Sequence, residues 1–270
     1  MLSWVRRVAG SAIVSIVALA AVASASEACS SDKPDDPPAV PLPSRNRRDP
    51  GETDASNVLQ PADTGPIDTG PPRDPFCFEP GLVLCFPFEG AIENNVTTPG
   101  KLFPAKTEGV TIVDGKKGKA AHFDVGGVIT FDQAAALEMQ AATVEAWVNR
   151  DLTSFGEDTV FDDDMRFAMT VSTDGTLLCK GAGVIVKGAK VGIEQWVHIA
   201  CVFDGTTVKA YVGGIETGSG AGAVGTSSDA GAAIGDNSPA GGEGFIGEID
   251  SLRVFNVARS PAEVSAAAQN

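Results

Sequence analysis

Histidines, the usual general acids and bases of enzymes, are scarce in this chain, which has only His122 and His198. Neither lies in a recognisable motif with a nucleophile, so nucleophilic catalysis is not predicted. Alternate side chains of an extended strand share a face, so His198 should lie with Trp196, Ala200 and Val202. The sequence therefore predicts a packed or hydrogen-bonded core histidine at position 198.

An acidic cluster near the middle of the chain offers a second kind of chemistry, the binding of a cation. It consists of Glu157, Asp158, Asp162, Asp163 and Asp164. The cluster lacks the glycine and the terminal glutamate of an EF-hand loop. We therefore expect a solvated acidic loop, with a cation site as the alternative.

Five cysteines leave one without a disulfide partner in an exported chain. Cys29 lies apart from the others, near the N-terminus. Cys77 and Cys85 are eight positions apart, a spacing that a short bridged loop can close, and Cys179 and Cys201 should both point inward from neighbouring strands. Among the three possible pairings of these four we predict Cys77–Cys85 and Cys179–Cys201, each worth about 2–4 kcal/mol.

The first thirty residues have the layout of a secretory signal peptide. Arg6 and Arg7 precede an apolar run over residues 12–22, and the small residues Ala23-Ser24-Ala25 follow it. The apolar run is shorter than the ~20 residues that a membrane span requires. The sequence therefore predicts export rather than a permanent transmembrane helix.

Cys29 ends the segment Ser26-Glu27-Ala28-Cys29, which resembles a bacterial lipobox, where the cysteine is diacylated and becomes the mature N-terminus. Ala28 fits this pattern, whereas Glu27 and Ser26 do not, so cleavage after Ala25 is the alternative. Lipidation of Cys29 would explain the odd cysteine. We therefore expect a lipoprotein at the outer membrane or cell surface, held only by its N-terminal lipid anchor, or otherwise a periplasmic or secreted protein.

Composition limits the partners and the organisation of the chain. With 35 acidic and 20 basic side chains, a net charge of −15 and a pI of 4.5, it lacks the basic face that nucleic-acid binding requires. Residues 30–75 are rich in Pro and Asp and offer almost nothing for a core, which predicts a disordered linker. We expect a signal peptide over residues 1–29, this linker over 30–75 and one domain over 76–270.

Short apolar runs separated by turn signals fill residues 76–270. Asp114-Gly115, Asp174-Gly175 and Asp204-Gly205 are such turn signals, and no helical period intervenes. This texture predicts an all-β domain, a two-sheet antiparallel jelly-roll sandwich. A short C-terminal helix should follow, because Ser260-Pro261-Ala262-Glu263 supplies an N-cap hydroxyl, a proline at the first helical position and the glutamate of a capping box.

Seven segments of this domain, taken in order, resemble one known family. They are Leu82–Gly90, Gly115–Asp124, Thr143–Val148, Trp196–Ala200, Phe203–Gly205, Tyr211–Gly214 and Phe245–Asn256. Over residues 80–268 the chain is thus similar to the laminin G-like, concanavalin A-like lectin/glucanase superfamily, of the bacterial surface type. The resemblance implies the sandwich fold but names no ligand, because this fold hosts lectins, glycosidases, adhesion modules and inert spacers.

Some members of this superfamily hydrolyse glycosidic bonds with two carboxylates. Glu248-Ile249-Asp250 resembles the start of their motif "E-x-D-x-x-E", but Arg253 stands where the second glutamate would be. A guanidinium cannot serve as a general acid. We therefore predict no catalytic residues.

Many relatives bind one structural Ca²⁺ through the aspartate of a "G-x-I-D" segment, which corresponds to Asp250 here. We expect Asp250 on the apolar strand face of Leu252 and Val254, where a carboxylate is costly unless it is paired or metal-bound. The other ligands that the resemblance implies are Glu89, Asn94 and Asn95. The alternative is an aspartate that is hydrogen-bonded to a neighbouring turn.

Aromatic residues that stack on sugars are few after the signal peptide, where the Trp and Tyr residues are Trp147, Trp196 and Tyr211. We expect both tryptophans to anchor the core. The function expected is an exported, surface-tethered, non-catalytic lectin-like module for binding or adhesion, whose partner is a glycan or an extracellular protein. The alternatives are a polysaccharide-active glycoside hydrolase and a purely structural surface domain.

Overall fold

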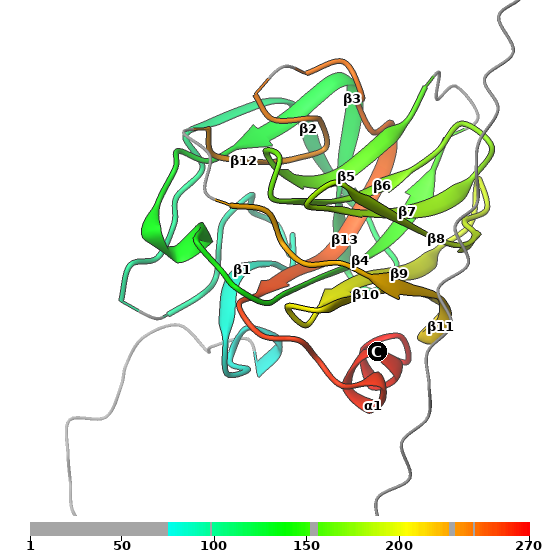
Figure 1. Ribbon diagram of the computed structural model, residues 1–270. Helices are drawn as coiled ribbons and strands as arrows, with labels where there is room; N and C mark the ends of the chain where they lie inside the picture. Colours follow the sequence, from blue (N-terminus) through cyan, green and yellow to red (C-terminus); the bar gives the residue numbers. More distant parts are fainter. Residues whose placement is uncertain (1–74, 98, 152–155, 227–229, 240) are drawn as a thin grey trace, which may run out of the picture. The chain divides into compact units, whose positions relative to one another are not determined.

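A computed structural model describes residues 75–97, 99–151, 156–226, 230–239 and 241–270 (Figure 1). The expected signal peptide, Cys29 and almost all of the expected linker lie outside these residues. Within the described part, no helix is long and apolar enough to cross a membrane.

The described residues form thirteen strands, two 3₁₀ turns and one α-helix. In chain order these are η1 (Pro75–Cys77), β1 (Leu82–Phe86), β2 (Lys106–Asp114), β3 (Lys119–Thr130), η2 (Ala135–Leu137), β4 (Ala142–Arg150), β5 (Asp158–Asp163), β6 (Phe167–Val171), β7 (Thr176–Gly181), β8 (Val184–Lys190), β9 (Val197–Phe203), β10 (Thr207–Val212), β11 (Ile215–Ala221), β12 (Ala232–Ile234), β13 (Gly247–Phe255) and α1 (Pro261–Ala267). The helix starts at the expected capping box of Ser260 and Glu263, which confirms that prediction.

The strands form two layers around one core (Figure 1). One layer has the order β11-β10-β9-β4-β13-β3, with β1 beside β13 and β2 beside β3, and the other has the order β12-β5-β6-β7-β8. The named pairs are antiparallel, as in β4 with β9 and β5 with β6. The predicted all-β sandwich is therefore confirmed.

Strand β3 belongs to both layers, because its first half pairs with β13 and its second half with β12. The bend lies at Gly126 and Gly127, where β2 has a bulge at Gly109. A Cβ atom on Gly109 would lie 3.0 Å from the Cα atom of Gly127, and Gly109 has a φ of +59°. Glycine is required at this corner because only it permits that conformation and that approach.

Two disulfides join Cys77 to Cys85 and Cys179 to Cys201, the pairing that the sequence analysis favours. Cys179 and Cys201 do not lie on neighbouring strands, however, so that expectation is wrong. Cys179 is on β7 and Cys201 on β9, and their bond crosses between the layers with a Cα–Cα distance of 5.5 Å. The layers approach closely here because Gly188 of β8 faces β10 and has no side chain. A Cβ atom at position 188 would lie 3.0 Å from the Cβ atom of Ala210.

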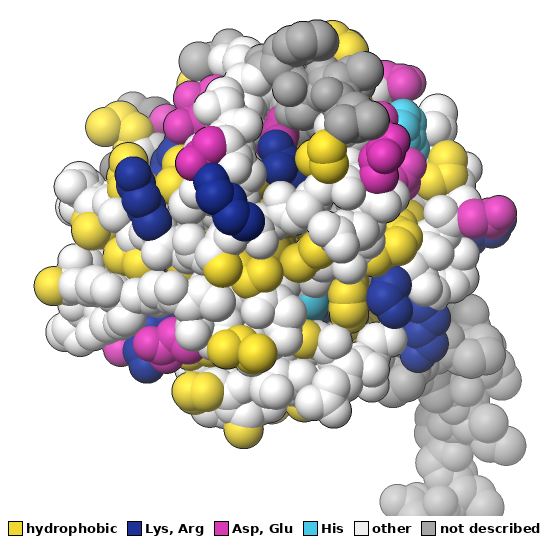
Figure 2. All heavy atoms as spheres, turned by 90° about the vertical axis from the view of Figure 1, so that its right-hand side faces the viewer, with side chains coloured by type: hydrophobic (Ala, Val, Ile, Leu, Met, Phe, Trp, Pro, Cys, Tyr) yellow, Lys and Arg dark blue, Asp and Glu magenta, His cyan; other side chains and the backbone are white. Residues whose placement is uncertain are grey.

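The face on the right of Figure 1, where β8 and β11 lie, carries exposed apolar side chains such as Ile185 and Ile215. Figure 2 shows that the hydrophobic side chains on this face are scattered among polar atoms, with charged side chains between them. Isolated apolar residues of this kind are normal on a protein surface and do not indicate a docking site.

Removing the bond between the layers should destabilise the domain more than removing the other bond. We expect Cys179→Ala combined with Cys201→Ala to lower the free energy of unfolding by about 3 kcal/mol, because this bond closes the longer loop, 22 residues against 8. Cys77→Ala combined with Cys85→Ala is the matched control, with a loss of about 2.5 kcal/mol. Urea unfolding measures both, and a different connectivity in peptide mapping would contradict the pairing.

Candidate binding site

The outer face of the layer formed by β9, β4, β13 and β3 carries the polar residues singled out in the sequence. Trp147 of β4 lies between His198 of β9 and Asp250 of β13 in the strand register. In the next row, Glu248 of β13 lies between Asn149 and His122. Because alternate residues of a strand share a face, their neighbours Val148 and Ile249 point into the core.

A bulge in β13 changes which residues share a face. Ser251 has a φ of +55°, and the register with β4 shifts between Asp250 and Arg253. Asp250 and Arg253 therefore both lie outside, whereas Leu252 and Val254 lie in the core. The expectation that Asp250 shares their apolar face is wrong for this reason.

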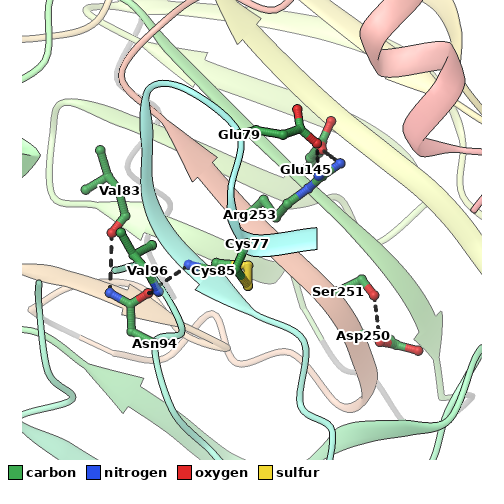
Figure 3. The surroundings of a disulfide bond; sticks show 10 residues. All are labelled: Cys77, Glu79, Val83, Cys85, Asn94, Val96, Glu145, Asp250, Ser251 and Arg253. Atoms are coloured by element: carbon green, nitrogen blue, oxygen red, sulfur yellow. Dashed lines mark hydrogen bonds and ion pairs between the residues drawn. A yellow bond between two sulfur atoms is a disulfide. The ribbon is translucent and has the colours of Figure 1, made fainter. Parts of the chain in front are cut away.

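Four charged side chains form a closed ring of ion pairs on this face. Arg253 and Arg259 each lie 2.5 Å from Oε1 of Glu145 on β4, and both also pair with Glu79 of the N-terminal segment. Figure 3 shows Glu79, Glu145 and Arg253 pointing toward one another near the Cys77–Cys85 bond. Burial raises the pKa of Glu145, while the two guanidinium groups oppose that shift.

This ring is not predicted from the sequence. A signal exists in Thr143–Val148, where Glu145 alternates with Val144 and Ala146, but an isolated glutamate on a strand normally points to solvent. Its two arginines come from more than one hundred positions away in the sequence, so their pairing depends on the fold.

A pocket of about 150 Å³ lies beside the ring, which we call the outer-face pocket. Glu145, Trp147, His198 and Arg253 line it from the sheet. The N-terminal segment, the turn before β3 and the end of α1 provide the other walls, through residues such as Phe76, Lys117 and Ala267. The pocket thus combines aromatic and ionic groups on one rigid sheet.

Both tryptophans expected in the core are half-buried and lie outside the core between the layers, so that expectation is wrong. The ring of Trp147 meets that of His198 edge to face at 5.6 Å, and the ammonium group of Lys116 lies 4.7 Å from its centroid. The position of Trp147 on the outer face follows from the strand alternation that places Val148 inside.

His198 is buried, as expected, but it lies on the outer face rather than in the core. Burial, together with the nearby charges of Arg253 and Arg259, lowers its pKa to about 3. The imidazole is therefore neutral at physiological pH. Its Nδ1 atom makes no hydrogen bond to any described residue.

The carboxylates of Glu89 and Asp250, two of the four expected calcium ligands, meet at the turn before β3. The backbone N–H of Lys117 donates to Asp250 and that of Lys119 to Glu89, each at 3.2 Å. Ser251 also donates to Asp250, whose pKa is raised by burial and by the nearby charge of Glu89. Asp250 is thus hydrogen-bonded to a neighbouring turn, as in the alternative interpretation.

Asn94 does not join them. Its Oδ1 atom accepts from the backbone of Cys85 and Val96, and its amide donates to the carbonyl of Val83 (Figure 3). The amide also donates to the carbonyl of Leu102. All of its hydrogen-bonding groups are therefore used in fixing the loop after β1. In the described part of the chain, no three His, Cys, Asp or Glu side chains gather with metal-binding geometry.

Asn95, the fourth expected ligand, is half-buried, and its backbone N–H donates to the carbonyl of Cys85 at 2.8 Å. This bond fixes the backbone at Asn95 in the loop after β1. Asn94 and Asn95 therefore contribute to the fold of this loop, and the convergence of carboxylates is confined to Glu89 and Asp250.

Glu248 is held by two neighbours. Its Oε1 atom lies 3.1 Å from Nδ1 of His122, and its Oε2 atom accepts from the amide of Asn149 at 2.9 Å. At the place of the second glutamate, Arg253 is engaged in the ion-pair ring. The geometry thus gives Glu248 no proton donor at that position.

The acidic cluster is not a solvated loop, and that expectation is wrong. Asp158, Asp162 and Asp163 are buried on β5. Asp158 accepts from Nε of Arg150 at 2.7 Å, and Asp163 lies 3.2 Å from Nε of Arg166. Buried arginines therefore accompany Asp158 and Asp163 on this strand, whereas Asp162 accepts from the backbone N–H of Ser238 at 2.9 Å.

The comparisons with known proteins agree with this architecture. Residues 123–265, more than half of the chain, match the model of the family described as the concanavalin A-like lectin/glucanases superfamily. The chain belongs to this superfamily. No curated protein matches it.

Solved structures with the same fold include several binding domains. One is domain 4 of AbnA, a GH43 extracellular arabinanase from Geobacillus stearothermophilus, in complex with arabinotriose. It is 25% identical to this chain with a TM-score of 0.57, and the match covers 70% of this chain and 98% of that domain. The binding domain of Paraclostridial Mosquitocidal Protein 1 is 16% identical with a TM-score of 0.55, over 70% and 52%. A Trypanosoma rangeli sialidase is 14% identical with a TM-score of 0.55, over 71% and 33%. This superfamily member thus spans only part of the latter two proteins.

The neutral state of His198 predicts a pH dependence of stability. Between pH 6.5 and about 3 the unfolded chain binds a proton at His198 that the folded chain does not, so stability falls as the pH falls. His198→Phe lacks this loss. We therefore expect the free energy of unfolding of the variant, minus that of the wild type, to increase by up to about 1.4 kcal/mol for each pH unit below 6.5.

Urea unfolding of both proteins between pH 6.5 and 4 measures the difference. Other groups with a raised pKa, such as Asp162 at about 6 and Asp163 at about 7, occur in both proteins and cancel. Parallel stability curves for the two proteins would show that His198 is protonated in the folded state.

Proposed function

We propose that this domain is a non-catalytic, lectin-like binding module that works outside the cytoplasm and binds a glycan. The observation that carries the proposal is the outer-face pocket, where the half-buried Trp147 adjoins Glu145, His198 and Arg253. Carbohydrates are bound by such combinations, because an aromatic ring packs on the sugar's C–H groups while polar groups bind its hydroxyls. The related domain of the arabinanase, bound to arabinotriose, supports a glycan over a protein as the ligand.

Export is supported by two disulfides, which persist in oxidising compartments, and by the signal-peptide pattern. We further propose that residues 30–75 act as a spacer and that a lipid on Cys29 tethers the protein to the outer membrane. Cys29→Ser should move the protein from the membrane fraction to the soluble exported fraction in cell fractionation. An unchanged distribution would contradict the anchor.

Glycan binding can be tested with a panel of immobilised glycans, including arabino-oligosaccharides, and with insoluble cell-wall polysaccharide. We expect retention of the wild type and at least tenfold weaker binding of Trp147→Ala, which removes the aromatic wall of the pocket. Trp196→Ala is the matched control, because Trp196 does not line the pocket. Equal binding of the two variants, or none by the wild type, would contradict the proposal.

A glycoside hydrolase is the alternative, since Glu248 has a histidine at hydrogen-bonding distance. We expect purified protein to release no reducing sugar from the polysaccharides that it binds. Release that is lost in Glu248→Gln would overturn the non-catalytic assignment.

We also propose a weak Ca²⁺ site between Asp250 and Glu89, whose carboxylates both bind the turn before β3 and whose charges act on each other. Calcium at about 5 mM, above the affinity range of extracellular calcium modules, should raise the midpoint of thermal unfolding relative to EDTA. Glu89→Gln should abolish the increase, and Glu93→Gln, in the neighbouring loop, should retain it. Equal midpoints of the wild type in calcium and in EDTA would exclude the site.

A further inference from the structure

A second pocket lies on the outer face of the other layer, over β5, β6 and β7, which lie side by side (Figure 1). We call it the acidic pocket. Asp162, Ala168 and Lys180 follow one another across these three strands, whereas Phe161 and Met169, in the row beside them, point into the core. The methyl group of Ala168 fills little space, so the surface is hollowed between the two charged side chains.

Acidic groups outnumber basic groups around this pocket. The charged side chains that line it, or that pair with one that does, are Glu157, Asp162, Asp163, Asp164, Arg166, Lys180 and Glu243. Five negative charges against two positive ones give a formal net charge of −3. A pocket of this sign attracts cations and repels anions.

Asp162 shows where a cation would be held. This residue is only 8% exposed, and its Oδ2 atom accepts from the backbone N–H of Ser238 at 2.9 Å. Its Oδ1 atom has no hydrogen-bond partner among the described residues, and it is not enclosed, in contrast to both carboxylate oxygens of Asp163. A carboxylate that is mostly removed from water is costly when one oxygen stays unpaired, so a ligand that pairs with Oδ1 is favoured.

The charges that face Asp162 do not compensate its own charge. Burial raises its pKa to about 6, and Asp164 from the turn after β5 and Glu243 from the loop before β13 add to this shift. Lys180 of β7 opposes them. The residues opposite Asp162 on β6 and β12 are both alanines and carry no charge. The folded protein therefore leaves room for a further positive charge at this carboxylate.

The open acceptors favour an ammonium group over other cations. A guanidinium group binds a carboxylate best through two parallel hydrogen bonds, and Oδ2 of Asp162 is already used by the backbone. An ammonium group needs only separate acceptors, which the hydroxyl groups of Thr159 and Thr170 in the pocket can also provide. Met165 and Ala168 add apolar surface for an alkyl chain that carries the ammonium.

We propose that the acidic pocket binds a primary ammonium group at the end of an alkyl chain, a lysine side chain of a partner protein, with Oδ1 of Asp162 as its counter-ion. The site lies on the other layer from the outer-face pocket and does not depend on the proposed glycan binding. The module would then hold two partners at once, a glycan on one layer and a lysine-bearing protein segment on the other.

The amide of Nα-acetyl-L-lysine tests the inference, because the side-chain ammonium is its only charge. We expect it to bind the full mature protein at pH 7 in EDTA, measured by NMR titration. The amide of Nα-acetyl-L-norleucine, which has the alkyl chain without the charge, should not bind. No binding of the lysine probe, or equal binding of the two, would overturn the inference. Tighter binding of D-glucosamine would assign the pocket to an amino sugar and overturn the protein partner.

Asp162→Asn is the matching variant, because it removes the charge and keeps an oxygen that can accept from Ser238. We expect about tenfold weaker binding of the lysine probe, the effect of losing one charged hydrogen bond. The thermal midpoint without the probe should stay unchanged or rise, because a poorly compensated charge is removed. Asp124→Asn is the control, since it removes a carboxylate outside the pocket and should bind as the wild type does. Unchanged binding of Asp162→Asn would overturn the site.

The pH profile separates a binding role of Asp162 from a structural one. Between pH 7 and pH 5 its carboxyl group takes up a proton, whereas the ammonium of the probe stays charged. Binding of the lysine probe should therefore weaken about tenfold over this range in the wild type and stay nearly constant in Asp162→Asn. Equal pH dependence of the two proteins would overturn the inference. Both proteins should bind the glycan panel equally, so its failure leaves the proposed function intact.

Discussion

Charge that is removed from water must be paired, and this constraint shapes the outer face of β4 and β13. Glu145 would be untenable on a covered strand without the two arginines that share its oxygen. Glu79 completes the ring from the N-terminal segment, and Arg259 reaches it from the chain that leads to α1. The ring therefore fixes the segments before β1 and after β13 over the same sheet, where they become walls of the outer-face pocket.

The pocket owes its polarity to the same arrangement. Burial keeps the neighbouring imidazole of His198 uncharged, and the guanidinium groups that neutralise Glu145 add to this effect, because a further cation beside them is unfavourable. The bulge at Ser251 matters equally, since it turns Arg253 outward toward Glu145 while Leu252 stays in the core. Ion pairing and a single backbone irregularity together convert the covered face of a β-sheet into a polar pocket.

Much of the fold can be predicted from the sequence, because alternation, turn residues and a capping box are local signals. The strands and the C-terminal helix follow from them, whereas the Cys179–Cys201 pairing is predicted correctly from a strand adjacency that does not exist. The bulge at Ser251 has no such signal, since its residue is not glycine, and strict alternation therefore places Asp250 wrongly. The aspartates of β5 look solvated for a similar reason, because a sequence does not show which arginine a carboxylate meets across strands.

If the domain is held by its N-terminal end, as we propose, the Cys77–Cys85 bond has a mechanical consequence. Tension arriving at Cys77 passes through the two sulfur atoms directly to Cys85 in β1, and the intervening loop carries none of it. Glu79 lies in that loop and closes the ion-pair ring. A force on the N-terminal side is therefore transmitted to the pairing of β1 with β13, and the loop that holds Glu79 at the edge of the outer-face pocket is not stretched.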